Sequence, residues 1–265
     1  MKRTEALISD ADGTLVDTVR LIRHGQFETA KLFLLQHGLD ETDIPSYEDY
    51  ELIINRMVGG PARDTLEQSV RLLFADTPHK LSGMDFDELH EMLNPVQDAL
   101  APEFIKSYQG LSGTLLALGD AGIKLAIFTS GTSYHIVRNF GIALPELGLS
   151  ELHRDRSTTD RAKLSKFTSI FSQYYGIQGF SVITAGDTKS HKPNPDSLLL
   201  AMKQLGTDPN KSAVLGDHSV DMKTAINAGV DRRIGITHGF DNRETLVKSG
   251  ATTVIDSLDD LIASL

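Results

Sequence analysis

The stretch LISDADGTLVD, residues 7–17, begins as a short apolar strand and ends in two closely spaced aspartates and a Gly-Thr turn. Other short stretches share its apolar character, are rich in Ile, Val and Leu, and lack alternation of apolar and polar residues. Such strands are typical of a parallel sheet that helices cover on both faces. The predicted strands are Ala6–Ser9, Leu125–Thr129, Ser181–Ala185, Ala213–Gly216, Arg233–Thr237 and Thr253–Ile255.

Helical patterns alternate with these strands from residue 110 onward, and glycines stand where several of the helices should end. Alternating strands and helices predict an α/β fold with a Rossmann-like, doubly wound parallel sheet as its core. The predicted helices are Ser112–Ala121, Tyr134–Phe140, Arg161–Tyr175, Ser197–Leu205, Val220–Ala228, Arg243–Ser249 and Leu258–Ser264.

Two segments interrupt this alternation. Between the first and second strands the chain carries helical patterns at Val19–His37, Arg63–Ala75 and Asp85–Leu100, and no convincing strand. Because one helix suffices for a crossover, we expect an inserted α-helical domain at 19–105 and a core made of 1–18 and 106–265. The second segment, 143–179, is also longer than an ordinary connection, and its polar run HRDRSTTDRAKLSK most simply predicts a solvated insertion of open role.

Composition excludes several classes of protein. A formal charge of −10 argues against a general nucleic-acid binder, which needs a basic face. The absence of cysteine excludes disulfides, a thiolate nucleophile and cysteine-based zinc sites, and the nine histidines show no zinc-like spacing. No apolar run reaches the length of a membrane helix or a signal peptide, so we expect a cytoplasmic protein without a membrane partner.

Residues that carry chemistry follow the predicted strands, at the edge of an open α/β sheet where ligands bind. They comprise four carboxylates, a hydroxyl, an ammonium and backbone amides, namely Asp10, Asp12, Thr129, Ser130, Gly131, Lys192, Asp217 and Asp221. Uncompensated, such a cluster of acids would raise its own pKa values. A hard divalent cation resolves the repulsion, and oxygen ligands without cysteine favour Mg²⁺ over zinc. These features point to phosphoryl chemistry.

Four motifs along the chain resemble those of the haloacid dehalogenase superfamily. They are DADGTLVD (10–17), AIFTSG (126–131), HKPNPD (191–196) and GDHSVDM (216–222). The resemblance is to the phosphatase and β-phosphoglucomutase-like branch, which carries a helical cap inserted after the first strand. It implies that the inserted domain 19–105 is a cap.

The resemblance implies a role for each motif residue. Asp10 would be the nucleophile that forms an aspartyl-phosphate, and Asp12 would protonate the leaving alkoxide and later activate water. Thr129 and Lys192 would hold the phosphoryl group, and Lys192 would also balance the charge of Asp10. A carboxylate is a weak nucleophile, and a nearby cation makes its attack on a phosphate dianion tolerable.

The resemblance also implies a Mg²⁺ site and contacts to substrate. The Mg²⁺ ligands would be Asp10, the backbone carbonyl of Asp12 and Asp217, with Asp221 in the first or second coordination shell. The amides of Ser130 and Gly131 could donate to phosphate oxygens, and so could those that follow Asp10. Taken alone, Thr129 and Asp217 would more simply be helix caps.

In the inserted domain, RMVGGPARDTLEQ (56–68) resembles the family's element that reaches over the active site. Gly59, Gly60 and Pro61 predict a turn, and a helix should begin near Ala62. Arg63 would then lie in the first turn. Two interpretations stay open for Arg63, contact with the non-transferred part of the substrate and simple exposure to solvent.

The leading hypothesis is a Mg²⁺-dependent phosphatase acting on a small phosphorylated metabolite, a sugar phosphate or a phosphoglycolate-like acid. The alternative is a phosphomutase of the β-phosphoglucomutase type, which uses the same motifs. A non-catalytic binding module is less favoured because all four motifs are intact. Dehalogenation is disfavoured because the dehalogenase branch lacks an acid where Asp12 stands. Substrate identity and oligomeric state stay open.

Overall fold

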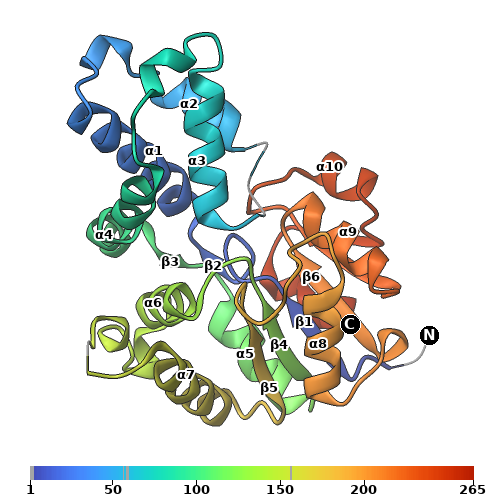
Figure 1. Cartoon of the computed structure of the whole chain (residues 1–265). Coiled ribbons are helices and arrows are strands. Elements are labelled where there is room, and N and C mark those ends of the chain that lie inside the picture. The colour runs from blue at the N-terminus through green and yellow to red at the C-terminus, as the bar shows by residue number, and fades with distance from the viewer. Residues whose placement is uncertain (1–2, 56, 58–59, 156) are drawn as a thin grey trace. The chain divides into compact units, whose positions relative to one another are not determined.

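Six parallel strands form the central sheet, in the order β5-β4-β1-β6-β7-β8. Of these strands, Figure 1 labels β5, β4, β1 and β6. This computed structural model describes residues 3–55, 57, 60–155 and 157–265. Each predicted strand is present, with bounds within two residues of those expected, and the predicted fold class is confirmed. The strands are β1 (Ala6–Ser9), β4 (Lys124–Phe128), β5 (Phe180–Ile183), β6 (Ser212–Gly216), β7 (Arg232–Ile236) and β8 (Thr253–Ile255).

The strand order indicates at which point of the sheet edge a ligand would bind. From β1 the chain builds β4 and β5 outward on one side, and then β6, β7 and β8 outward on the other. The direction of building therefore reverses between β1 and β6. Ligands of open α/β sheets bind beyond the carboxyl ends of the strands at such a reversal. In this chain Asp10 and Asp217 directly follow those two strand ends.

Helices cover the sheet. Their apolar residues recur at helical spacing and so lie on one face, which packs against the strands. On one face, α8 (Asp196–Leu205) and α9 (Ser219–Asn227) pack against Ile8, Phe128 and Val214. Helix α8 presents its buried apolar residues three or four positions apart, and full burial of each large one contributes about 1.5–3 kcal/mol. The remaining helices of this unit are α5 (Leu111–Asp120), α6 (Ser133–Ala143), α7 (Asp160–Tyr175), α10 (Arg243–Lys248) and α11 (Leu261–Ser264).

The segment 143–179 is more buried than its polar run predicts. The rings of Phe167 and Phe171 on α7 contact Phe140 on α6, which brings this segment into the apolar interior. Lys163 of the polar run is buried, and its ammonium donates to the carbonyl of buried His153 at 3.0 Å. The prediction of a solvated insertion is therefore wrong for this part of the run, because an aromatic stripe on its helix outweighs the charges around it.

Contacts between Cα atoms divide the chain into two units, one of residues 1–17 and 106–265 and one of residues 18–105. In the first unit, β2 (Val16–Asp17) pairs antiparallel with β3 (Lys106–Ser107), just before the chain leaves that unit and just after it returns. The sequence did not predict this ladder, because two residues per strand are too few to carry a pattern.

The second unit consists of helices. They are α1 (Val19–Gln36), α2 (Tyr47–Ile54), α3 (Ala62–Leu73) and α4 (Phe86–Phe104), with short 3₁₀ turns at Glu41–Asp43 and Pro78–Leu81. Phe33, Leu66 and Leu89, from three of these helices, belong to one apolar cluster. The sequence missed α2, although Ser46 caps it by accepting from the amide of Asp49 at 3.1 Å. No helix in the described part of the chain is long and apolar enough to cross a membrane.

Candidate active site

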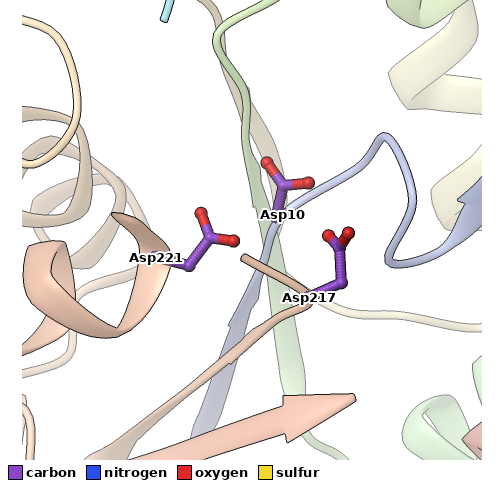
Figure 2. Close-up of side chains that lie close together, drawn as sticks. All are labelled: Asp10, Asp217 and Asp221. Carbon is purple, nitrogen blue, oxygen red and sulfur yellow. The ribbon is translucent and has the colours of Figure 1, made fainter. Parts of the chain in front are cut away.

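Three buried carboxylates meet at the carboxyl edge of the sheet. Asp10 follows β1, Asp217 follows β6, and Asp221 lies in the first turn of α9. One carboxylate oxygen of each lies within 4.8 Å of the others, and Figure 2 shows the three carboxylates close together. Within the described residues this is the one cluster of acidic or metal-binding side chains with such spacing. The sequence predicted this juxtaposition from strand ends alone.

The ammonium of Lys192 joins two of these carboxylates. It donates to Asp10 Oδ1 at 2.5 Å and to Asp221 Oδ1 at 2.8 Å, and it lies 3.8 Å from the ring centroid of Phe128. The Lys192 side chain is only 5% exposed. Burial acts to lower the pKa of Lys192, but Asp10 and Asp221 outweigh burial and hold that pKa above its usual value. Lys192 therefore stays charged beside Asp10.

The turn after β1 holds Asp217. Thr14 Oγ1 donates to Asp217 Oδ1 at 2.5 Å, and the amide of Phe240 donates to Oδ2 at 2.8 Å. Gly13 has a φ of +84°, and a Cβ there would approach Asp217 Oδ2 to 2.6 Å. Both the left-handed backbone and the missing side chain are therefore needed for the turn to pass so close to this carboxylate.

The donor set suits a Mg²⁺ ion. The cluster offers three carboxylates against one ammonium, so two negative charges stay uncompensated when all three are ionised. Burial raises the pKa of Asp10 to about 7, with Lys192 opposing the rise and Asp221 adding to it. Burial, Asp10 and Asp221 also raise the pKa of Asp217 well above its usual value. A divalent cation would lower both pKa values again. Each Asp217 oxygen that accepts from Thr14 or Phe240 keeps a further lone pair, with which it can bind the cation.

The raised pKa of Asp10 predicts that the metal-free protein loses stability as the pH rises. From about pH 4 to about pH 7 the unfolded chain releases this proton while the folded chain keeps it, so the folded state binds more protons and stability falls across that window. Thermal melts in EDTA from pH 5 to pH 8 measure the effect. Asp10→Asn should reduce the fall, and a fall equally steep in wild type and variant would contradict the prediction.

Asp12 lies outside this cluster of carboxylates. Its Oδ1 accepts a hydrogen bond of 2.7 Å from Nδ2 of Asn139 on α6, and its side chain is half-buried. The two aspartates of the quoted stretch therefore have different surroundings. Asp10 faces the ammonium of Lys192, whereas Asp12 faces a neutral amide. Two carboxylates in such different surroundings can take different chemical roles.

The loop after β4 carries the predicted phosphate contacts. Thr129 is buried, and its Oγ1 accepts a hydrogen bond of 2.9 Å from the amide of Gly131. That amide is thus engaged with Thr129 in this structure, while Ser130 and Gly131 are half-buried. Thr129 does not cap α6, whose N-cap is Thr132.

The remaining predictions concern the start of α3 in the helical unit and the start of α9. In the helical unit, Arg63 is exposed in the first turn of α3, which begins at Ala62 as predicted. The predicted turn includes Gly59, which lies outside the described residues. The N-cap of α9 is His218 rather than Asp217, and Asp221 is buried rather than solvated.

Three groups at the site were not predicted from the sequence. Thr14 belongs to the quoted stretch, but its role with Asp217 depends on a partner far along the chain. Asn139 follows Arg138, and this polar pair interrupts an otherwise apolar stretch of α6, which is the signal that could have marked it. Phe240 acts through its backbone amide, so its side chain gives no signal.

Comparisons with known proteins find related sequences and similar folds. The family model of the haloacid dehalogenase-like hydrolases matches residues 4–229. Pyrophosphatase PpaX of Bacillus velezensis is 23% identical over 98% of this chain and 96% of its own. A phosphoglycolate phosphatase of Agrobacterium fabrum is 27% identical over 97% of this chain and 91% of its own. Among solved structures, a predicted phosphoglycolate phosphatase from Haemophilus somnus superimposes with a TM-score of 0.72 at 18% identity, covering 99% of this chain and 98% of that one.

Proposed function

The chain belongs to the haloacid dehalogenase-like hydrolases, and from this premise we propose that it is a Mg²⁺-dependent phosphatase that acts through an aspartyl-phosphate on Asp10. The superfamily that the four motifs indicated is thereby confirmed. The relatives support the enzyme class of phosphoric monoester hydrolase. As substrate we propose a small phosphorylated metabolite, a sugar phosphate or a phosphoglycolate-like acid.

One observation carries the proposal: three buried carboxylates and a buried lysine meet where the direction of sheet building reverses. A purely structural cluster would neutralise its own charge, since burying uncompensated carboxylates costs stability. This cluster has a surplus of negative charge, and burial, with a contribution from Asp221, raises the pKa of Asp10 to about 7. Strongly perturbed carboxylates in such a place are typical of a catalytic site that binds a cation.

In the first step, Asp10 attacks the phosphorus atom and the bond from phosphorus to the leaving oxygen breaks. Lys192 keeps the attacking carboxylate close to a positive charge and stabilises the oxygens of the transferred group. Asp12 gives its proton to the departing alkoxide. Thr129 and the amides of the loop after β4 orient the phosphoryl group.

In the second step, Asp12 accepts a proton from water as that water attacks the phosphorus of the aspartyl-phosphate. The bond from phosphorus to Asp10 breaks, and inorganic phosphate and the free Asp10 carboxylate are formed. Mg²⁺, when bound by Asp10, Asp217, Asp221 and the carbonyl of Asp12, supplies positive charge that stabilises the phosphate oxygens. We propose that Asp12 and Asp10 hold these roles because their surroundings differ.

We further propose that the helical unit acts as a cap that limits the access of water during phosphoryl transfer. Its insertion between β2 and β3 supports this role, because both ends of the insert join one small ladder. In this proposal Arg63 would contact the part of the substrate that is not transferred. Exposure of Arg63 at a helix start is compatible with such a contact.

A substrate panel tests the proposed function. Purified protein is incubated with sugar phosphates, 2-phosphoglycolate and pyrophosphate, with Mg²⁺ or with EDTA, and released phosphate is measured. We expect Mg²⁺-dependent release from at least one monoester and a loss of at least about 100-fold in EDTA. Release that is unchanged by EDTA would contradict the metal role. Isomerisation of a sugar phosphate without phosphate release would instead identify a phosphomutase.

A further inference from the structure

We propose that Asn139 is a positioning residue that holds the carboxyl group of Asp12 for proton transfer to the leaving group. The inference deepens the proposed function and rests on it, since it assumes that Asp12 is the general acid. It begins from the observation that the carboxylate of Asp12 lies apart from the other three carboxylates of the site. The carboxylates of Asp10, Asp217 and Asp221 face one another, whereas the carboxylate of Asp12 faces α6.

The contact between Asn139 and Asp12 is short and sheltered. Asn139 Nδ2 donates to Asp12 Oδ1 at 2.7 Å, and Asn139 itself is only 3% exposed. Such a donor restricts the rotation of a carboxyl group at the end of a two-torsion side chain. Asp12 lies beyond the end of β1, in an isolated bridge with Val16, so the regular strand does not fix its side chain. A buried partner on a helix supplies that restraint.

Arg138 fixes which end of the Asn139 amide faces Asp12. Arg138 Nε donates to Asn139 Oδ1 at 3.0 Å, so the amide oxygen faces a donor and the amide nitrogen faces the carboxylate. Rotating the amide by half a turn would set its oxygen against the carboxylate and its NH₂ against the guanidinium. Both contacts would be repulsive, so the hydrogen bonds allow one orientation.

Burial makes this chain of contacts rigid. Arg138 is 1% exposed, is the largest fully buried side chain among the described residues, and lies with its guanidinium 5.8 Å from the ring centroid of Tyr134. A buried guanidinium polarises the amide to which it donates, and this strengthens the next hydrogen bond in the series. The restraint on Asp12 therefore comes from two buried residues of α6, Arg138 and Asn139.

The role predicts a dependence on the leaving group. An alkoxide leaves poorly without a proton, whereas p-nitrophenolate is a stable anion that leaves without one. Loss of the Asn139 amide should therefore slow the cleavage of alkyl phosphates more than that of p-nitrophenyl phosphate. The ratio kcat/KM is the correct measure, since it reports the steps up to the first release of the leaving group and excludes the later attack of water.

The test compares Asn139→Leu with wild type on p-nitrophenyl phosphate and on glucose 6-phosphate or 2-phosphoglycolate, whichever the panel selects. We expect kcat/KM to fall at least about 10-fold on the alkyl phosphate and less than about 3-fold on p-nitrophenyl phosphate. The Mg²⁺ concentration that half-maximally raises the melting temperature should stay unchanged, because the Asp12 side chain lies outside the acidic cluster.

Two further variants make the result specific. Asn139→Asp keeps the shape and the contact with Arg138 but removes the donor, and it decides the question if Asn139→Leu unfolds at the assay temperature. Thr114→Val removes a different buried hydrogen bond, between Thr114 Oγ1 and the carbonyl of Leu258, and should leave both substrates unchanged. Equal losses on both substrates, or no loss in either Asn139 variant, would overturn the inference and leave the phosphatase intact. A wild type inactive on every phosphate monoester overturns both proposals.

Discussion

The Asp10→Asn variant is expected to lose at least about 10⁴-fold in turnover, because an amide cannot attack phosphorus and no aspartyl-phosphate can form. At the same time the metal-free variant should melt at a higher temperature than wild type. Asp10 is a buried carboxylate beside Asp221 and Asp217, and its removal relieves repulsion within the cluster. A rise of about 3 °C corresponds to about 1 kcal/mol for a chain of this size.

The measurements are phosphate release with saturating Mg²⁺ and thermal melts in EDTA at pH 8. Asp256→Asn is the matched control, because Asp256 lies at the surface and pairs with Arg243 rather than with the cluster. The control should keep wild-type turnover. An Asp10→Asn protein that retains more than a tenth of wild-type turnover would exclude Asp10 as the nucleophile.

Replacing Lys192 by Met should lower turnover by about 10²–10³-fold, the effect of removing one preorganised charge from a transferring group. The ammonium of Lys192 donates to both Asp10 and Asp221, so its loss also leaves two buried carboxylates without a cation. Removing one partner of a buried ion pair costs about 3–5 kcal/mol. The metal-free variant should therefore be much less stable than wild type, and Mg²⁺ should restore a large part of the loss.

Lys211→Met is a suitable control for this experiment. Lys211 is more than a third exposed and pairs with Glu5 at the surface, where an ion pair contributes little to stability. Its removal should change neither turnover nor melting temperature appreciably. If Lys192→Met and Lys211→Met behaved alike in both assays, the coupling of Lys192 to the cluster would be wrong.

The sequence predicted the sheet and the acidic cluster because both depend on short-range signals. Continuous apolar strands mark a covered parallel sheet, and residues just after β1 and β6 meet whenever those strands are neighbours. Asp10, Asp217 and Asp221 are therefore predictable from two short motifs, 10–17 and 216–222. The helical content of the insert follows from its apolar spacing, although α2 is too short for that spacing to be clear.

The partners of these residues could not be predicted, because they depend on contacts between distant parts of the chain. Thr14 meets Asp217, and Asn139 meets Asp12, only once β1, β6 and α6 have packed together. A polar pair such as Arg138 and Asn139 within an apolar stretch of a helix is compatible with many contacts, so its sequence position alone does not identify a partner. The burial of His153 and Lys163 depends in the same way on the packing of α7.

The two-residue ladder of β2 and β3 bears on how the chain could have diverged. Asp17 and Lys106 are directly paired, so the points of departure and return of the helical unit are adjacent. Neighbouring antiparallel strands can be joined by a turn of about two residues, which means that the sheet's own connectivity does not require the insert. One insert could therefore be exchanged for another without rerouting the strands. Under the proposed function, substrate preference and phosphoryl chemistry are then free to evolve on separate stretches of the same gene.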